Sequence, residues 1–301
     1  RAAITADTLA LAKRGGVPVA DYLALTALPA PRTSGEWLLL VEGLDDLDEA
    51  LEGTPAQAAL RGWARARLAP QLDRLGWTDA PGDSLTTLRL RGALVDALGR
   101  FDHAPTIERA RRAYADGTAA ASTVAGVLNT VGRHADAAAY TSLLAARRTA
   151  SGQEERWRLE HAIALVRDPK LAQRTLDLTL TDEWQPGVAT RMATQVGAVG
   201  GHAELAFAFV QQHFVALAAK SGDAGKLWLL PGSAAGFNES AWADRLLAAQ
   251  DARPGEAGRD PAQRVAETIR EKSVIRSAEG GRLALQLRSP VPSGVATPHS
   301  L

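Results

Sequence analysis

The chain has 301 residues, of which 46% are hydrophobic, so it is long enough to bury a sizeable core in one extended domain or two compact ones. Its 34 Lys and Arg residues balance 34 Asp and Glu residues. Because no net field attracts phosphate backbones or anionic lipids, we expect neither nucleic acid nor a membrane as a partner. The absence of cysteine excludes a disulfide framework and a thiolate metal site, but leaves the compartment open.

The first seven residues contain neither an initiator Met nor the apolar core of a signal peptide, so the chain looks like a piece of a longer protein. From there on, apolar residues return at helical spacing and β-branched runs are scarce, which predicts an all-α chain. Breakers should divide it into helices of roughly 10 to 20 residues. In chain order they are 53–55, 76–82, 116–117, Gly132, 151–152, 168–169, 186–187, 200–201 and Gly222.

Three residues offer side-chain oxygens at predicted helix starts: Ser84, Ser151 and Asp168. Helix pairs that return every 30 to 45 residues or so are typical of a degenerate repeat array. We therefore expect a right-handed superhelical stack of antiparallel helix pairs, an α-solenoid of the HEAT or armadillo kind, over residues 1–288. Residues 289–301 have three prolines and little to pack, which predicts an extended tail.

Motifs for catalysis or metal binding are missing from the sequence. His134 is followed by Ala-Asp-Ala-Ala and His202 by Ala-Glu-Leu-Ala, so neither begins the His-Glu-x-x-His pattern of a helical zinc site. No serine lies in Gly-x-Ser-x-Gly. We expect no catalytic, cofactor-binding or metal-binding residue in this chain.

Two glycine-rich segments and one acidic stripe have competing interpretations. Residues 197–201 lack the preceding strand of a dinucleotide fold, and residues 222–227 have the wrong spacing for a P-loop, so both are interpreted as turns between helices. Glu42, Asp45, Asp46 and Glu49 recur at helical spacing. This stripe either binds a cation or a basic peptide, or is a solvated helix face.

One stretch, residues 72–99, carries a family resemblance. It reads LDRLGWTDAPGDSLTTLRLRGALVDALG: a Leu-Gly-Trp end, an acidic Pro-Gly turn and a Leu-Arg opening of a new apolar helix. These features resemble the C-terminal helical domain of the gluzincin aminopeptidases, the family of aminopeptidase N and the puromycin-sensitive and endoplasmic-reticulum aminopeptidases. Further similar segments, at 7–25, 36–47, 106–114, 160–171, 200–217 and 262–269, extend the resemblance over roughly residues 4 to 275. Departures such as Gln185-Pro186, where the family often has Gln-Asp, suggest a distant bacterial member.

The resemblance implies the noncatalytic C-terminal domain of a zinc metallo-aminopeptidase, a peptide hydrolase. The zinc is then expected in a thermolysin-like catalytic domain of the same polypeptide, whose His-Glu-x-x-His and Gly-x-Met-Glu-Asn motifs this sequence lacks. The implied role is a helical bowl that covers the active-site chamber and limits or positions peptide substrates.

Arg89, Arg191 and Arg264 are the candidates for pairing with a peptide carboxylate, although each fits an ordinary surface or interhelical arginine as well. A free-standing helical-repeat scaffold that binds a protein partner is the alternative function. An enzyme with an unrecognised carboxylate site is a weaker one.

Overall fold

The computed structural model describes residues 2–27, 33–253 and 259–288, which form α-helices joined by turns and contain no strand. The predicted all-α class is therefore confirmed. The helices are α1 (Ala2–Lys13), α2 (Val19–Ala27), α3 (Ser34–Ala50), α4 (Pro55–Leu75), α5 (Leu85–Arg100), α6 (Ala104–Ala115), α7 (Val124–Arg133), α8 (Ala137–Thr149), α9 (Gln153–Ala164), α10 (Pro169–Thr179), α11 (Pro186–Ala198), α12 (Ala203–Ala219), α13 (Asp223–Ala234), α14 (Ser240–Asp251), α15 (Arg259–Glu279) and α16 (Arg282–Arg288).

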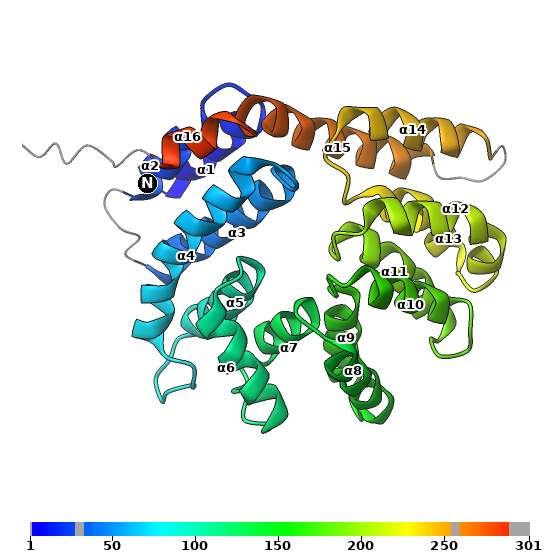
Figure 1. Ribbon diagram of the computed structural model, residues 1–301, viewed down its shortest axis with the longest axis horizontal. Helices are drawn as coiled ribbons and strands as arrows, with labels where there is room; N and C mark the ends of the chain where they lie inside the picture. Colours follow the sequence, from blue (N-terminus) through cyan, green and yellow to red (C-terminus); the bar gives the residue numbers. More distant parts are fainter. Residues whose placement is uncertain (1, 28–32, 254–258, 289–301) are drawn as a thin grey trace, which may run out of the picture.

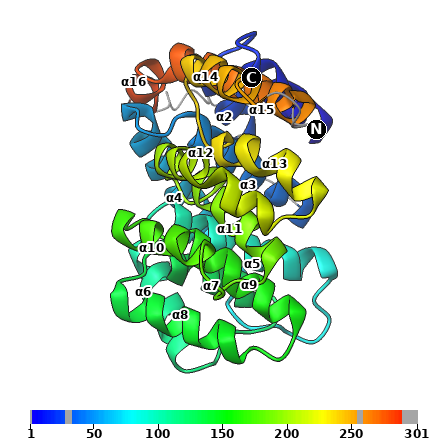
Figure 2. The same cartoon turned by 90° about the vertical axis from the view of Figure 1, so that its right-hand side faces the viewer.

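The helices form two curved layers. The odd-numbered helices from α3 to α15 pack side by side in series, and each even-numbered helix from α4 to α14 packs against the two odd-numbered helices that flank it. Figure 1 shows the odd-numbered layer on the side of the centre, and Figure 2 shows successive pairs stacked above one another. This arrangement is the predicted α-solenoid of stacked helix pairs.

The solenoid closes on itself. Helix α15 packs on α13 and α14, and also on α1 and α3, while α16 packs on α2 and α4. The last helices therefore meet the first ones, and the described chain makes a ring (Figure 1). Closure was not predicted from the sequence. The extended tail expected at residues 289–301 lies outside the described residues, and the domain boundaries stay a prediction.

Helix starts follow local capping chemistry at two of the three predicted positions. The Ser84 side chain accepts the N–H of the third residue of α5 at 3.1 Å, and Asp168 accepts that of Lys170 at 2.8 Å. The prediction for Ser151 is wrong. Helix α9 begins one residue later, so Gly152 occupies the cap position and no side chain caps this end.

Glycines let the inner helices approach closely. Gly132 was predicted to break a helix, but it lies inside α7, where a Cβ atom would come within 2.0 Å of the Ala162 carbonyl oxygen of α9. A Cβ on Gly197 of α11 would likewise lie 2.4 Å from the Ser233 carbonyl oxygen of α13. Backbone therefore packs on backbone, and this draws the helix ends of the inner layer together around the centre.

Candidate functional site in the central cavity

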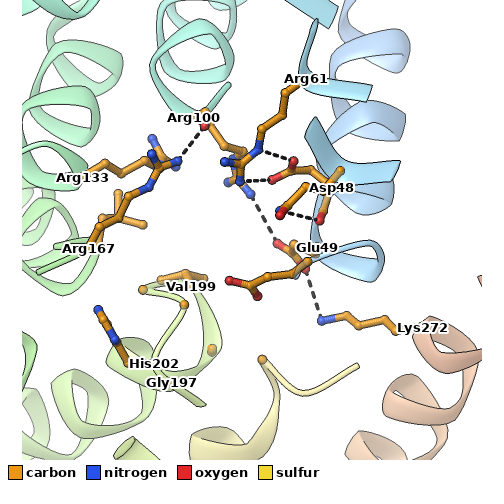
Figure 3. A pocket seen from close by; sticks show the side chains of 17 residues that line it. Asp48, Glu49, Arg61, Arg100, Arg133, Arg167, Gly197, Val199, His202 and Lys272 are labelled. Atoms are coloured by element: carbon orange, nitrogen blue, oxygen red, sulfur yellow. Dashed lines mark hydrogen bonds and ion pairs between the residues drawn. The ribbon is translucent and has the colours of Figure 1, made fainter. Parts of the chain in front are cut away.

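A cavity of about 320 Å³ lies where the inner helices converge. Its lining comes from α3, α4, α5, α7, α11 and α15 and from the turns that follow α3, α9, α11 and α13. Among the even-numbered helices, only α4 contributes lining residues. Figure 3 shows side chains from these elements pointing toward one another across the space. The glycine-rich segment 197–201 is a turn between helices, as predicted, and it also forms one wall.

The cavity is rimmed by the C-terminal ends of inner helices. The last carbonyls of a helix have no partner within the helix and carry partial negative charge. Five cationic side chains line the same space and provide matching donors: Arg61, Arg100, Arg133, Arg167 and Lys272. For example, Arg167 donates to the Arg100 carbonyl at 2.7 Å, and Lys272 to the Ala235 carbonyl at 3.1 Å.

Two histidines also donate hydrogen bonds to carbonyls at helix ends. His134 Nε2 lies 2.9 Å from the Gly99 carbonyl oxygen, and His202 Nε2 lies 2.8 Å from that of Val166. Because a carbonyl oxygen only accepts, each Nε2 carries the proton and donates. Both histidines therefore link the end of one inner helix to the next helix pair. Burial lowers the pKa of His134, which favours this neutral, donating form.

Ion pairs tie the first part of the ring to the middle. Arg61 binds both carboxylate oxygens of Asp48, at 2.6 Å and 2.8 Å, and also contacts Asp102 at 3.0 Å. Arg167 donates to the other oxygen of Asp102. Figure 3 shows the Arg61 pair with Asp48. Asp102 has φ +60°, a conformation that L residues rarely adopt, and its two arginine partners hold it there. These arginines also lower the pKa of Asp102 against the effect of its burial.

The acidic stripe on α3 is divided between two environments. Asp45 and Glu49 each lie 3.5 Å from Arg100, and Glu49 also lies 3.2 Å from Lys272. Burial raises the pKa of Asp45 to about 7, with the Arg100 charge acting in the opposite direction. Asp46, by contrast, pairs with Lys13 on the exposed side. The interpretation as a purely solvated face is therefore wrong for Asp45 and Glu49.

One carboxylate in the cavity stays unpaired. Within the part of the chain that the structure describes, the Glu52 side chain has neither a hydrogen-bond nor an ion-pair partner, although its backbone carbonyl accepts from Asn238 at 3.3 Å. Partial burial, followed by the nearby Asp48 charge, raises its pKa. Glu52 is therefore an acceptor that remains available in the cavity.

The three arginines predicted from the sequence lie elsewhere and are not brought together in the cavity. Arg89 is exposed on α5, and Arg264 is exposed on α15 with its guanidinium 5.8 Å from the Trp228 ring centre. Arg191 on α11 donates through Nη2 to the buried Glu160. Its Nη1 is buried and has no hydrogen-bond partner among the described residues. Their role at a peptide carboxylate stays a prediction.

Sequence reasoning missed the arginines of the cavity, although a signal for them exists. Arg100, Arg133 and Arg167 lie 33 and 34 residues apart, each at or just after the end of an inner helix. This spacing matches the length of a typical helix-pair repeat. The turn at Gly200 and Gly201 occupies the next equivalent position, and its missing side chains leave room for the cavity.

The described residues lack two further features. No group of three or more His, Asp or Glu side chains in these ranges has an arrangement that could hold a metal ion. In the same ranges, no helix combines the length and hydropathy needed to cross a bilayer.

A family model described as the ERAP1-like C-terminal domain matches residues 1–271 of this chain. The match spans nearly the whole described ring and is close to the extent of the resemblance traced in the sequence. This family is the C-terminal helical domain of aminopeptidases, in agreement with the all-helical solenoid found here. The chain therefore belongs to the family of ERAP1-like C-terminal domains.

Proposed function

We propose that this domain covers the active-site chamber of a zinc metallo-aminopeptidase and limits or positions its peptide substrates, while the catalytic domain of the same polypeptide holds the zinc. The observation that carries the proposal is the closed helical ring, with charged side chains of α3, α4, α5, α7 and α15 and of the turns after α3 and α9 around one cavity. A chamber walled by such a ring would exclude folded proteins by size and strengthen pairing with charged peptide groups.

Among the three arginine candidates, Arg191 has the best support as a peptide-carboxylate partner. Glu160 is shared by Arg191 and Arg147, so the local charge keeps a positive excess. The Arg191 side chain is 29% accessible, and its buried Nη1 has no hydrogen-bond partner among the described residues, so a change of side-chain rotamer would present this donor to a carboxylate. Arg89 and Arg264, which are exposed, stay in the proposal as alternatives for the same role.

Peptide binding to the chain tests this role directly. We would titrate a fluorescently labelled decapeptide, with either a free or an amidated C-terminus, and measure anisotropy. We expect saturable binding that favours the free carboxylate. Arg191→Lys keeps a positive charge beside Glu160 but removes Nη1, so it should abolish the preference, whereas the exposed Arg89→Gln serves as a matched control. No saturable binding of either peptide would refute the positioning role, and a preference lost only in Arg89→Gln or Arg264→Gln would move it to that residue.

The noncatalytic role and the aminopeptidase context need separate tests. The purified chain, assayed with and without added zinc against aminoacyl reporter substrates, should show no turnover. Metal-dependent turnover that persists through purification would contradict the proposal. A reading frame that encodes a thermolysin-like segment upstream is also expected. Its absence would favour the alternative, a free-standing scaffold for a protein partner.

A further inference from the structure

The buried apolar side chains of the ring form two separate cores. The first lies within α1–α6 and α16, and the second within α8–α14. Helix α7 is shared, with Val127 in the first core and Leu128 in the second, and so is α15, with Ile275 in the first and Ile269 in the second. We call each core with its helices a lobe. The partly buried Tyr114 touches both cores.

Helix α15 crosses from the second lobe to the first through a stretch that buries no side chain. The helix packs on α13 and α14 in the second lobe and on α1, α3 and α16 in the first (Figure 1). Between Ile269 and Ile275, residues 270–274 are all partly or fully exposed. Parts of a fold with few buried apolar contacts move most readily. This stretch of α15 is therefore where the helix can bend when the lobes move.

Helix α7 meets α5 of the first lobe at backbone distance. A Cβ atom at Gly126 would lie 2.6 Å from the Gly92 carbonyl oxygen, and one at Gly99 would lie 2.1 Å from Thr130 Oγ1. Because side chains interdigitate little at such a contact, it opposes a small rotation of one helix on the other less than interlocked ridges and grooves would. Helix α7 and residues 270–274 of α15 are thus the two places where the lobes join and can turn.

Polar contacts tie the two lobes together. Arg167 of the second lobe donates to the Asp102 carboxylate and, at 2.7 Å, to the Arg100 carbonyl, both in the first lobe. Asn238 of the second lobe donates to three carbonyls at the end of α3, at 3.2 to 3.3 Å. Asp102 is held at φ +60°, and such strained residues cluster at ligand clamps and switch regions. Polar ties permit relative motion that a large apolar interface would prevent.

We propose that the ring is a two-lobed clamp that widens and narrows the central cavity, with α7 and residues 270–274 as hinges and the contacts of Asp102 and Asn238 as the clasp. The cavity is lined by α3, α4 and α5 of the first lobe and by the turns after α9, α11 and α13 of the second. Turning the lobes about a few hinge residues therefore changes the distance between facing walls. The clamp needs neither a peptide nor a catalytic domain, so it is independent of the proposed function.

Distance measurements by double electron–electron resonance test the clamp in the intact chain. The chain has no cysteine, so two introduced cysteines carry both spin labels. The inter-lobe pair is Ala66→Cys on α4 with Ala216→Cys on α12, two helices on opposite sides of the ring (Figure 1). Each control pair lies within one lobe: Ala66→Cys with Ala115→Cys on α6, and Ala145→Cys on α8 with Ala216→Cys. All four positions are exposed.

We expect a broader distance distribution for the inter-lobe pair than for either control pair. Asp102→Asn removes the charge that holds Arg167, and Asn tolerates positive φ as Asp does. This variant should shift the inter-lobe distribution by a few ångströms and leave the control pairs unchanged. The matched control Asp182→Asn, which replaces an exposed acid in the turn after α10, should change none of the three distributions.

An inter-lobe distribution as narrow as those of the control pairs, in both wild type and Asp102→Asn, would show one rigid body and overturn the proposal. Equal broadening of all three pairs would mean that the whole fold loosens, which also contradicts hinged lobes. If Asp102→Asn fails to fold by circular dichroism, wild type in about 1 M salt replaces it, because screening over roughly 3 Å weakens the same ion pair. An inter-lobe distribution that this salt leaves unchanged would then refute the clasp.

Discussion

Glu160 is the residue whose loss we expect to cost the most stability for the smallest change in shape. It is 2% exposed on α9, and its two oxygens accept from Arg147 Nε, at 3.1 Å, and from Arg191. Replacing Glu160 by Gln removes the negative charge while keeping the volume. Two guanidinium groups then lose their shared counter-ion in a largely dry environment.

The expected loss is about 3 kcal/mol in the free energy of unfolding, the low end of the range for breaking a buried pair. The low end applies because Arg147 keeps its 2.9 Å bond to the Glu183 carbonyl and its stacking on Trp184, with the guanidinium 4.6 Å from the ring centre. Arg191 is also partly exposed, with 29% of its side chain accessible.

Urea unfolding followed by circular dichroism measures the loss. Glu154→Gln is the matched control, because it breaks an exposed pair with Arg158 within the same helix and should change the free energy by less than about 0.5 kcal/mol. If Glu160→Gln and Glu154→Gln unfold with the same free energy, the pairing does not hold α8, α9 and α11 together, and the reasoning fails.

Three more predictions concern folding. Burial and the nearby Arg133 charge lower the pKa of His161, although Asp96 opposes them, so unfolding takes up a proton that the folded state excludes. The free energy of unfolding should therefore fall as pH drops below about 6.5, and His161→Gln should flatten this dependence in a pH series of urea titrations. Gly132→Ala should cost about 2 kcal/mol or more through its backbone clash, whereas Gly152→Ala, with open space around it, should be near neutral by thermal unfolding. Asn238→Ala removes the donor to three carbonyls at the end of α3 and should cost about 1 to 2 kcal/mol.

Each of these three has a clear contrary outcome. An identical pH dependence of wild type and His161→Gln would mean that the imidazole is not excluded from protonation by the fold. Equal melting temperatures for the two glycine variants would mean that the inner helices separate at no cost. A stable Asn238→Ala variant would show that other contacts suffice to close the ring between α3 and the turn after α13.

The site illustrates how far sequence patterns reach. The sequence around His134 and His202 lacks a zinc motif, but the bonds of these histidines to carbonyls of the preceding helix pairs could not be foreseen. Glu160 is a charged residue, yet it is buried because arginines of α8 and α11 meet it there. A helical wheel shows which side of one helix a residue occupies, and it contains no information about the neighbour on that side.

The sequence by itself determined the all-helical class, most helix boundaries and the family, because capping, breaking and periodicity act within a few residues of one another. The closure of the ring and the composition of the central cavity were decided by the tertiary structure. Contacts such as that between Asn238 and the end of α3 join positions nearly 190 residues apart. They exist because each helix pair is rotated slightly relative to the one before it. These rotations add up until the last inner helix reaches the first, and no local sequence pattern specifies their total.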